Sequence, residues 1–160
     1  MAYILSGAEL ANECIFCELP ALGPAHYREH LILAAQPHAF VMMNRYPYNN
    51  GHVMVVPRSH LGDPADLSPE EFDATLRLVR DATTAIRSVL CPHGFNVGQN
   101  LGRVAGAGIE NHCHWHIVPR WNGDTNFMPV VAEAKVISEH LEATYARLLP
   151  AFAPLGEGPA

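Results

Sequence analysis

Short apolar segments separated by turn residues predict most of the strands in this chain. Residues 32–35 and 39–43 are apolar and flank Gln-Pro-His, a sequence typical of a hairpin turn. A third segment at 53–56 is rich in β-branched residues and is followed by Pro57, and a further strand is expected at 95–97. The pattern therefore predicts several short strands joined by turns.

A long amphipathic helix is predicted between the third and fourth of these strands. Ser68 stands at the N-cap, Pro69 at the first helical position and Glu71 at the third, which forms a capping box. Apolar or small residues then recur at spacings of three and four, which predicts one buried face: Phe72, Leu76, Val79, Thr83, Ile86 and Leu90. Pro92 ends the helix, and a shorter helix is expected from about residue 138 to 149.

Histidine alternates with bulky or apolar residues just before a final apolar segment. His112, His114 and His116 would lie on one face of a strand, with the intervening side chains in the core. Histidine is neither a strong strand former nor a common core residue, so the row indicates chemistry. On a strand, residues four apart are separated by about 13 Å. Because zinc–nitrogen bonds are only about 2.0–2.1 Å long, the three rings are expected to have separate roles.

The element order β-β-β-α-β-β-α favours an α+β domain built on an antiparallel sheet. With 160 residues, 49% of them hydrophobic and 16% charged, the chain is long and apolar enough for one globular domain. We expect a single domain over residues 1–160, with its core at about 14–150 and a frayed tail at 151–160.

Charge and hydropathy narrow the expected partners. A formal net charge of −6 disfavours nucleic acid. No apolar stretch is long enough to span a membrane, and the first residues do not resemble a secretory signal, so we expect a cytoplasmic protein without a membrane partner. In a reducing compartment Cys14 and Cys17 are interpreted as metal ligands or free thiols, and Cys91 and Cys113 as core residues.

The segment from His112 to Val118 resembles the signature of the histidine triad (HIT) family, His-x-His-x-His followed by two apolar residues. Residues 44–47 and 51–57 are similar to the family's upstream loop and strands, and the likeness spans about residues 14 to 127. The resemblance is strongest to the branch of diadenosine polyphosphate hydrolases and phosphorylases, the fragile-histidine-triad-like proteins, whose continuation residues 119–127 resemble. It implies a HIT-like fold of about five antiparallel strands and a homodimer that joins two sheets edge to edge.

The resemblance also implies an enzyme, a nucleotide hydrolase or nucleotidyltransferase. His114 would attack the α-phosphorus of a diadenosine polyphosphate, and water or phosphate would discharge the nucleotidyl-histidine. Imidazole suits this role because one nitrogen is unprotonated near neutral pH. His116 would donate to the phosphoryl oxygens or the leaving group, and His52 supplies a fourth imidazole. Two alternatives remain open: hydrolysis of an adenosine 5'-phosphoramidate such as AMP-lysine, and a zinc-stabilised nucleotide-binding module with weak turnover.

Substrate contacts follow from the same resemblance. Asn44 corresponds to a position that holds the ribose hydroxyls, and Asn100 to an amide that binds the α-phosphate. Gly106 and Gly108 lie in a glycine-rich loop whose backbone N–H groups can approach phosphate closely. The chain departs from many members by lacking a hydroxyl residue at 108–111.

Cys14 and Cys17, in a Cys-x-x-Cys motif, form half of a tetrahedral zinc site. Some triad proteins complete such a site with a histidine after the Val-Pro strand and with the first triad histidine, which are His60 and His112 here. We therefore predict structural zinc and no organic cofactor. A redox-active dithiol, usually found at a helix start in a βαβ unit, and a metal-free thiol pair are the alternatives.

Overall fold

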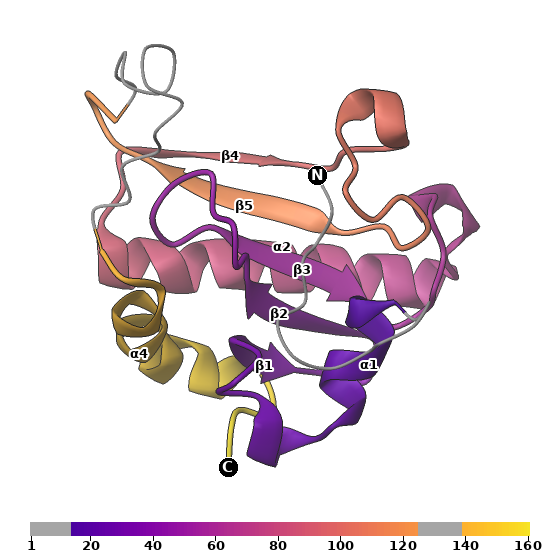
Figure 1. Ribbon diagram of the computed structural model, residues 1–160, viewed down its shortest axis with the longest axis horizontal. Coiled ribbons are helices and arrows are strands. Elements are labelled where there is room, and N and C mark those ends of the chain that lie inside the picture. Colours follow the sequence, from indigo (N-terminus) through magenta and orange to yellow (C-terminus); the bar gives the residue numbers. More distant parts are fainter. Residues whose placement is uncertain (1–13, 125–138) are drawn as a thin grey trace.

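A computed structural model describes residues 14–124 and 139–160 of the chain (Figure 1). Its strands form one antiparallel five-stranded sheet in the order β1-β2-β3-β5-β4. The strands are β1 (Ile32–Ala35), β2 (Ala39–Met43), β3 (Val53–Pro57), β4 (Gly94–Gly98) and β5 (Trp115–Arg120). The α-helices are α1 (Ile15–Ala21), α2 (Pro69–Leu90) and α4 (Leu141–Phe152). The predicted α+β class, with a five-stranded antiparallel sheet, is confirmed.

The two faces of the sheet are covered by different helices (Figure 1). Val53 and Val55 of β3 pack with residues of α2 and α4 in one core cluster. Met54 and Val56, which point the opposite way, pack in a second cluster with Phe16 of α1. Because both faces are covered, β1, β2 and β3 are apolar throughout instead of alternating.

Helix α2 begins as the sequence predicts, and Val79, Ile86 and Leu90 of the predicted face are buried. The Ser68 hydroxyl accepts a hydrogen bond from the Glu71 N–H at 3.2 Å. Leu76, also expected to be buried, is exposed, because the buried face extends instead over Thr75, Leu78, Ala82 and Ala85. Cys91 caps the helix in the left-handed conformation and is exposed, so its core assignment was wrong, whereas Cys113 is buried.

Two elements near the cysteines and histidines differ from expectation. The seven residues of α1, which include Pro20, are too few for a helical period to show in the sequence. Strand β5 begins at Trp115 and not at His112. The Cys113 N–H donates to the Leu61 carbonyl at 2.7 Å, so the backbone before β5 pairs with the loop after β3 and not with a strand.

The C-terminal segment is packed, and the expectation of a frayed tail was wrong. Phe152 is fully buried, and Ala153–Leu155 form a 3-10 turn. Glu157 then exchanges two backbone hydrogen bonds with Ala35 on β1, at 2.8 and 2.9 Å. Residue 138, the expected start of the last helix, lies outside the described residues. No helix within the described ranges is both long and apolar enough to cross a membrane.

Candidate functional site

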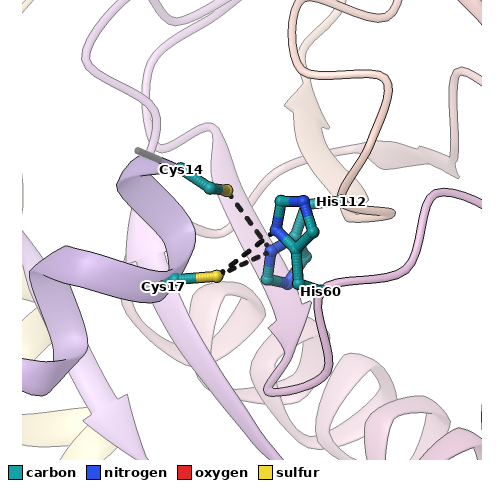
Figure 2. Close-up of side chains that lie close together, drawn as sticks. All are labelled: Cys14, Cys17, His60 and His112. Carbon is teal, nitrogen blue, oxygen red and sulfur yellow. Dashed lines mark hydrogen bonds between the residues drawn. The ribbon is translucent and has the colours of Figure 1, made fainter. Parts of the chain in front are cut away.

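Four predicted metal ligands come together at one end of the sheet (Figure 2). Their ligand atoms all lie within 4.8 Å of one another. Cys14 is the N-cap of α1 and Cys17 lies in its first turn. His60 belongs to the loop after β3, and His112 lies three residues before β5. The prediction from the sequence that these four side chains lie together is confirmed.

The spacing of these side chains fits a tetrahedral metal. The Cys14 Sγ lies 3.4 Å and the Cys17 Sγ 3.6 Å from the His112 Nδ1, and the Cys17 Sγ lies 3.4 Å from the His60 Nδ1. Zinc–sulfur bonds of about 2.3 Å and zinc–nitrogen bonds of about 2.0–2.1 Å at a tetrahedral angle separate sulfur from nitrogen by about 3.6 Å. Two thiolates with two imidazoles are also a donor set that suits zinc.

The protonation of His112 is fixed by the backbone. Its Nε2 lies 2.9 Å from the Pro57 carbonyl oxygen, which can only accept, so Nε2 carries the proton. The lone pair on Nδ1 then faces the two sulfur atoms. Burial lowers the pKa of His112, which keeps the ring neutral as a metal ligand must be.

The pKa of the Cys17 thiol is shifted by its surroundings in the same cluster. Burial, followed by the neighbouring Cys14, raises the pKa of the Cys17 thiol to about 11. Two adjacent thiolates repel each other, and a divalent cation between them would reverse this shift, because a coordinating thiol is deprotonated.

A buried carboxylate supports the loop that carries His60. Glu71 of α2 accepts hydrogen bonds from the Ser59 N–H at 2.8 Å and from the Ser59 hydroxyl at 2.6 Å. Glu71 is buried, so both bonds are shielded from water. The loop is thereby attached to the long helix one residue before the ligand.

His114 has the protonation opposite to that of His112. Its Nδ1 donates to the His112 carbonyl at 2.9 Å, so its Nε2 is unprotonated. Burial lowers the pKa of His114, and the hydrogen bond to the carbonyl opposes this only in part. The ring of Phe16 packs against it with centroids 4.9 Å apart. His114 is therefore a neutral imidazole with its lone pair at a fixed position.

A backbone amide sets the protonation of the next two rings. The Tyr48 N–H donates to the His52 Nδ1 at 3.0 Å, so the His52 proton resides on Nε2. That Nε2–H donates to the His116 Nδ1 at 2.9 Å, which leaves the His116 proton on its own Nε2. Burial, then the neighbouring His114, lowers the pKa of His116 to about 4. The His114 and His116 rings lie 4.9 Å apart. A nitrogen lone pair and an N–H donor thus lie on adjacent rings.

The loop that presents the Tyr48 amide is anchored on two sides. The Asn49 side chain donates to the Pro119 carbonyl at 3.1 Å and to Asp124 at 2.8 Å. The Asn50 side-chain oxygen accepts from Thr144 of α4 at 2.8 Å. Sequence analysis did not find these contacts, because a backbone amide has no residue-type signal and asparagine is common in turns.

The predicted substrate-binding residues fall into two groups. Asn44 is buried, and its backbone N–H donates to the His52 carbonyl at 2.9 Å, so it adjoins the histidine cluster. Its side-chain oxygen accepts from the Tyr46 N–H at 2.9 Å. Asn100, Gly106 and Gly108 lie in the loop after β4, where the Asn100 amide donates to the Gly106 carbonyl at 3.4 Å.

This loop begins beside the triad, because Gly98 at the end of β4 pairs with His116. Gly106 adopts a φ of 91°, which favours glycine. A Cβ on Gly108 would have no atom within 4 Å. The loop therefore begins beside the histidine row and has open space around the Gly108 backbone.

A sheet that carries a row of histidines next to a Cys2His2 cluster is a combination that can be compared with known protein families. The family model described as HIT domain matches residues 28–123, and the chain belongs to this family. The chain is 40% identical over 129 residues to an AP-4-A phosphorylase of Mycobacterium tuberculosis, a match that covers 81% of this chain and 65% of that protein. It is 32% identical over 109 residues to an adenosine 5'-monophosphoramidase of Schizosaccharomyces pombe, covering 68% and 75%.

Solved structures agree with the fold. A zinc-bound histidine triad family protein from Mycobacterium smegmatis superposes with a TM-score of 0.68 at 26% identity, covering 89% of this chain and 94% of that one. A diadenosine triphosphate hydrolase from Plasmodium falciparum superposes with a TM-score of 0.60 at 16% identity, covering 79% and 77%. The family resemblance predicted from the triad is thus confirmed.

Proposed function

We propose that this protein is an enzyme that transfers AMP from diadenosine polyphosphates, through a covalent nucleotidyl-His114 intermediate. The observation that carries the proposal is the fixed pair of rings: the bare Nε2 of His114 beside the Nε2–H of His116. One nitrogen can attack phosphorus while the other donates to the oxygen that gains charge.

The reaction has two displacements. In the first, the His114 Nε2 lone pair forms a bond to the α-phosphorus, and the bond to the bridging oxygen breaks with its electrons on the departing nucleotide. The His116 Nε2–H, oriented by His52, donates to a phosphoryl oxygen or to that leaving oxygen. In the second, an oxygen of phosphate or water attacks phosphorus and the proton that it carries passes to solvent, while the bond from phosphorus to the His114 Nε2 breaks with its electrons on nitrogen, so that His114 departs as a neutral imidazole. Burial lowers the pKa of His114, so its neutral form is favoured before and after reaction.

Phosphate is the acceptor that we favour, with diadenosine tetraphosphate as substrate. The support is the 40% identity to a protein named AP-4-A phosphorylase. Phosphorolysis would yield ADP and ATP, whereas asymmetric hydrolysis would yield AMP and ATP.

The test is to incubate the protein with diadenosine tetraphosphate, with and without phosphate, and to separate the nucleotides. ADP with ATP, formed only when phosphate is present, is the expected result. AMP with ATP in both conditions would make the protein a hydrolase that uses the same intermediate. AMP binding without turnover would contradict an enzyme and favour a binding module.

A phosphoramidate is the second candidate substrate. It is supported by the 32% identity to a protein named adenosine 5'-monophosphoramidase. The same His114 attack would release an amine, whose nitrogen would take the His116 Nε2 proton, and the water that discharges the intermediate would return a proton to His116. Faster release of AMP from an AMP-lysine conjugate than from the diadenosine compound would favour this candidate.

Other residues receive supporting roles in the proposal. We propose that Asn44 holds the ribose, and that Asn100 with the backbone at Gly106 and Gly108 binds phosphate oxygens. Cys14, Cys17, His60 and His112 would hold structural zinc, which when bound cross-links α1 to the loop after β3 and the start of β5.

We also propose a cytoplasmic homodimer with no nucleic-acid or membrane partner. The order of strands leaves β4 at the outer edge of the sheet, where a second copy could pair with it. Val97 on this strand is half-exposed.

Val97→Glu would place a negative charge on this edge of each copy, and the repulsion between the two copies should convert dimer to monomer in light scattering. An unchanged mass for both proteins would contradict this interface.

A further inference from the structure

We infer that Phe16 is a positioning residue that covers the nucleophile, and that the Cys2His2 site holds this cover in place. The inference rests on the proposed function, since it assigns His114 as the reactive ring. It gives the metal site a task beyond holding the fold together, namely keeping the His114 ring oriented and shielded from water.

The first physical link runs through His112. Its Nδ1 faces the two cysteine sulfurs, and its Nε2–H is tied to the Pro57 carbonyl. The backbone carbonyl of the same residue accepts the His114 Nδ1–H at 2.9 Å. A ligand fixed at Nδ1 therefore also fixes the carbonyl that decides which nitrogen of His114 is bare.

The second link runs through Phe16, which lies between the two cysteine ligands in sequence. Its ring centroid is 5.4 Å from that of His112 and 4.9 Å from that of His114. Phe16 is 2% exposed and His114 is 7% exposed, so the aromatic ring helps to exclude water from the nucleophile. The same ring reaches the apolar cluster on this face of the sheet.

Helix α1 depends on its anchors to stay in place. It has seven residues and contains Pro20, and isolated helices shorter than about 12–15 residues are marginal in water. Its N-cap, Cys14, makes no side-chain capping bond. Anchoring at Cys14 and Cys17 would hold both ends of the segment that carries Phe16, and losing that anchor would uncover His114.

The test measures protection of His114 directly, without turnover. Diethyl pyrocarbonate acylates unprotonated imidazole, and mass spectrometry of peptides locates each adduct. At pH 7.5, above the ordinary histidine pKa of about 6.5, protonation does not limit labelling. The exposed His26 and His93 serve as internal controls. His60 and His112 are left out of the comparison, because removal of metal uncovers them directly.

Phe16→Ala should label His114 about tenfold faster than wild type, the change expected for about 1.4 kcal/mol of lost protection, with labelling of the controls unchanged. Phe16→Leu, which keeps an apolar cover, should restore most of the protection. Elemental analysis should show metal retained in both variants. Chelation of the wild-type protein should also speed labelling of His114.

Unchanged His114 labelling after chelation would overturn the inference that the metal site holds Phe16 in place. Unchanged His114 labelling in Phe16→Ala would overturn the inference that Phe16 shields His114. If Phe16→Ala does not fold, chelated wild type and Phe16→Leu decide the matter. A protein that shows the expected labelling but cleaves no diadenosine compound would refute the proposed function alone.

Discussion

The Cys2His2 cluster and the neighbouring pair of His114 and His116 use the same side chain in opposite ways. At His112 a backbone carbonyl takes the proton of Nε2 and leaves Nδ1 for the sulfur-lined site. At His114 a carbonyl takes the proton of Nδ1 and leaves Nε2 bare. Two histidines only two residues apart are thus given different chemistry by the carbonyl each one meets.

The comparison shows where specificity of role comes from in this chain. His112 and His114 are the same type of residue, and burial lowers the pKa of both. What differs is the carbonyl that each ring meets, because the His112 Nε2 faces the Pro57 carbonyl whereas the His114 Nδ1 faces the His112 carbonyl. Substitutions that separate the two roles therefore test this explanation.

The largest effect is expected for His114→Ala. Loss of a nucleophile should reduce turnover by at least about 10⁴-fold, while elemental analysis should show metal content unchanged. His26→Ala, at an exposed position, is the matched control. Activity that survives in His114→Ala would sink the proposed mechanism.

Cys17→Ser should cause loss of metal and reduced stability. Binding at about 100 times the dissociation constant adds about 2.7 kcal/mol. At about 2–4 °C per kcal/mol for a chain of this size, the melting temperature should fall by about 5–10 °C. Calorimetry and elemental analysis measure both effects. Cys91→Ser, outside the cluster, should change neither, and full metal content in Cys17→Ser would reject the site.

His52 is expected to act through His116. His52→Ala removes the donor that fixes the His116 proton, so kcat should fall by about 10- to 100-fold, less than the 10²–10⁴-fold of a direct general acid. His52→Gln can accept from the Tyr48 N–H and donate to His116, so it should recover much of the rate. Equal rates for the two variants would argue against the relay.

Glu71 should affect the metal site alone. Glu71→Ala frees Ser59, and loss of such outer support should weaken metal affinity by about tenfold or more. Glu71→Gln can still hydrogen-bond to Ser59 and should lose less. Competition with a chelator measures the affinity, and a matching loss in both variants would show that charge, not the hydrogen bonds, is what matters.

The last effect is a dependence of stability on pH. Unfolded His116 takes up a proton near its ordinary pKa of about 6.5, but burial keeps the folded pKa at about 4. Stability should therefore be fully present above pH 6.5 and be lost as pH falls toward 4, at no more than about 1.4 kcal/mol per pH unit.

Urea unfolding of wild type and His116→Gln over this pH range measures the difference. The variant should show the shallower decline. Both proteins keep the same metal ligands, so release of metal at low pH affects them equally. Parallel curves would contradict the assignment.

Features with a strong local pattern were predictable from the sequence. Strands β1 and β2 matched the predicted bounds, and α2 began at Pro69 because its capping box is local. The four metal ligands were predicted from the family resemblance, since their side-chain types are distinctive. Leu76 was misplaced because the buried face of α2 also includes Thr75, Ala82 and Ala85, small residues that carry little hydrophobic signal.

The supporting contacts could not be predicted. The Tyr48 N–H is a backbone group, and its position depends on a loop anchored by Asn49 and Asn50 to residues about 70 and 94 positions away. The role of Phe16 required α1, whose seven residues show no period. Such long-range contacts exist only after the sheet has formed.

The backbone exchange between Glu157 and Ala35 has a consequence for assembly. It occupies hydrogen-bonding groups on the outer side of β1, and a Cβ on Gly156 would come within 2.5 Å of the Ala35 carbonyl oxygen, so only glycine fits there. A sheet that can add strands at both margins can polymerise into fibres, whereas one blocked margin limits growth to a closed pair. Gly156 is therefore needed for the C-terminal segment to cover this part of the β1 edge.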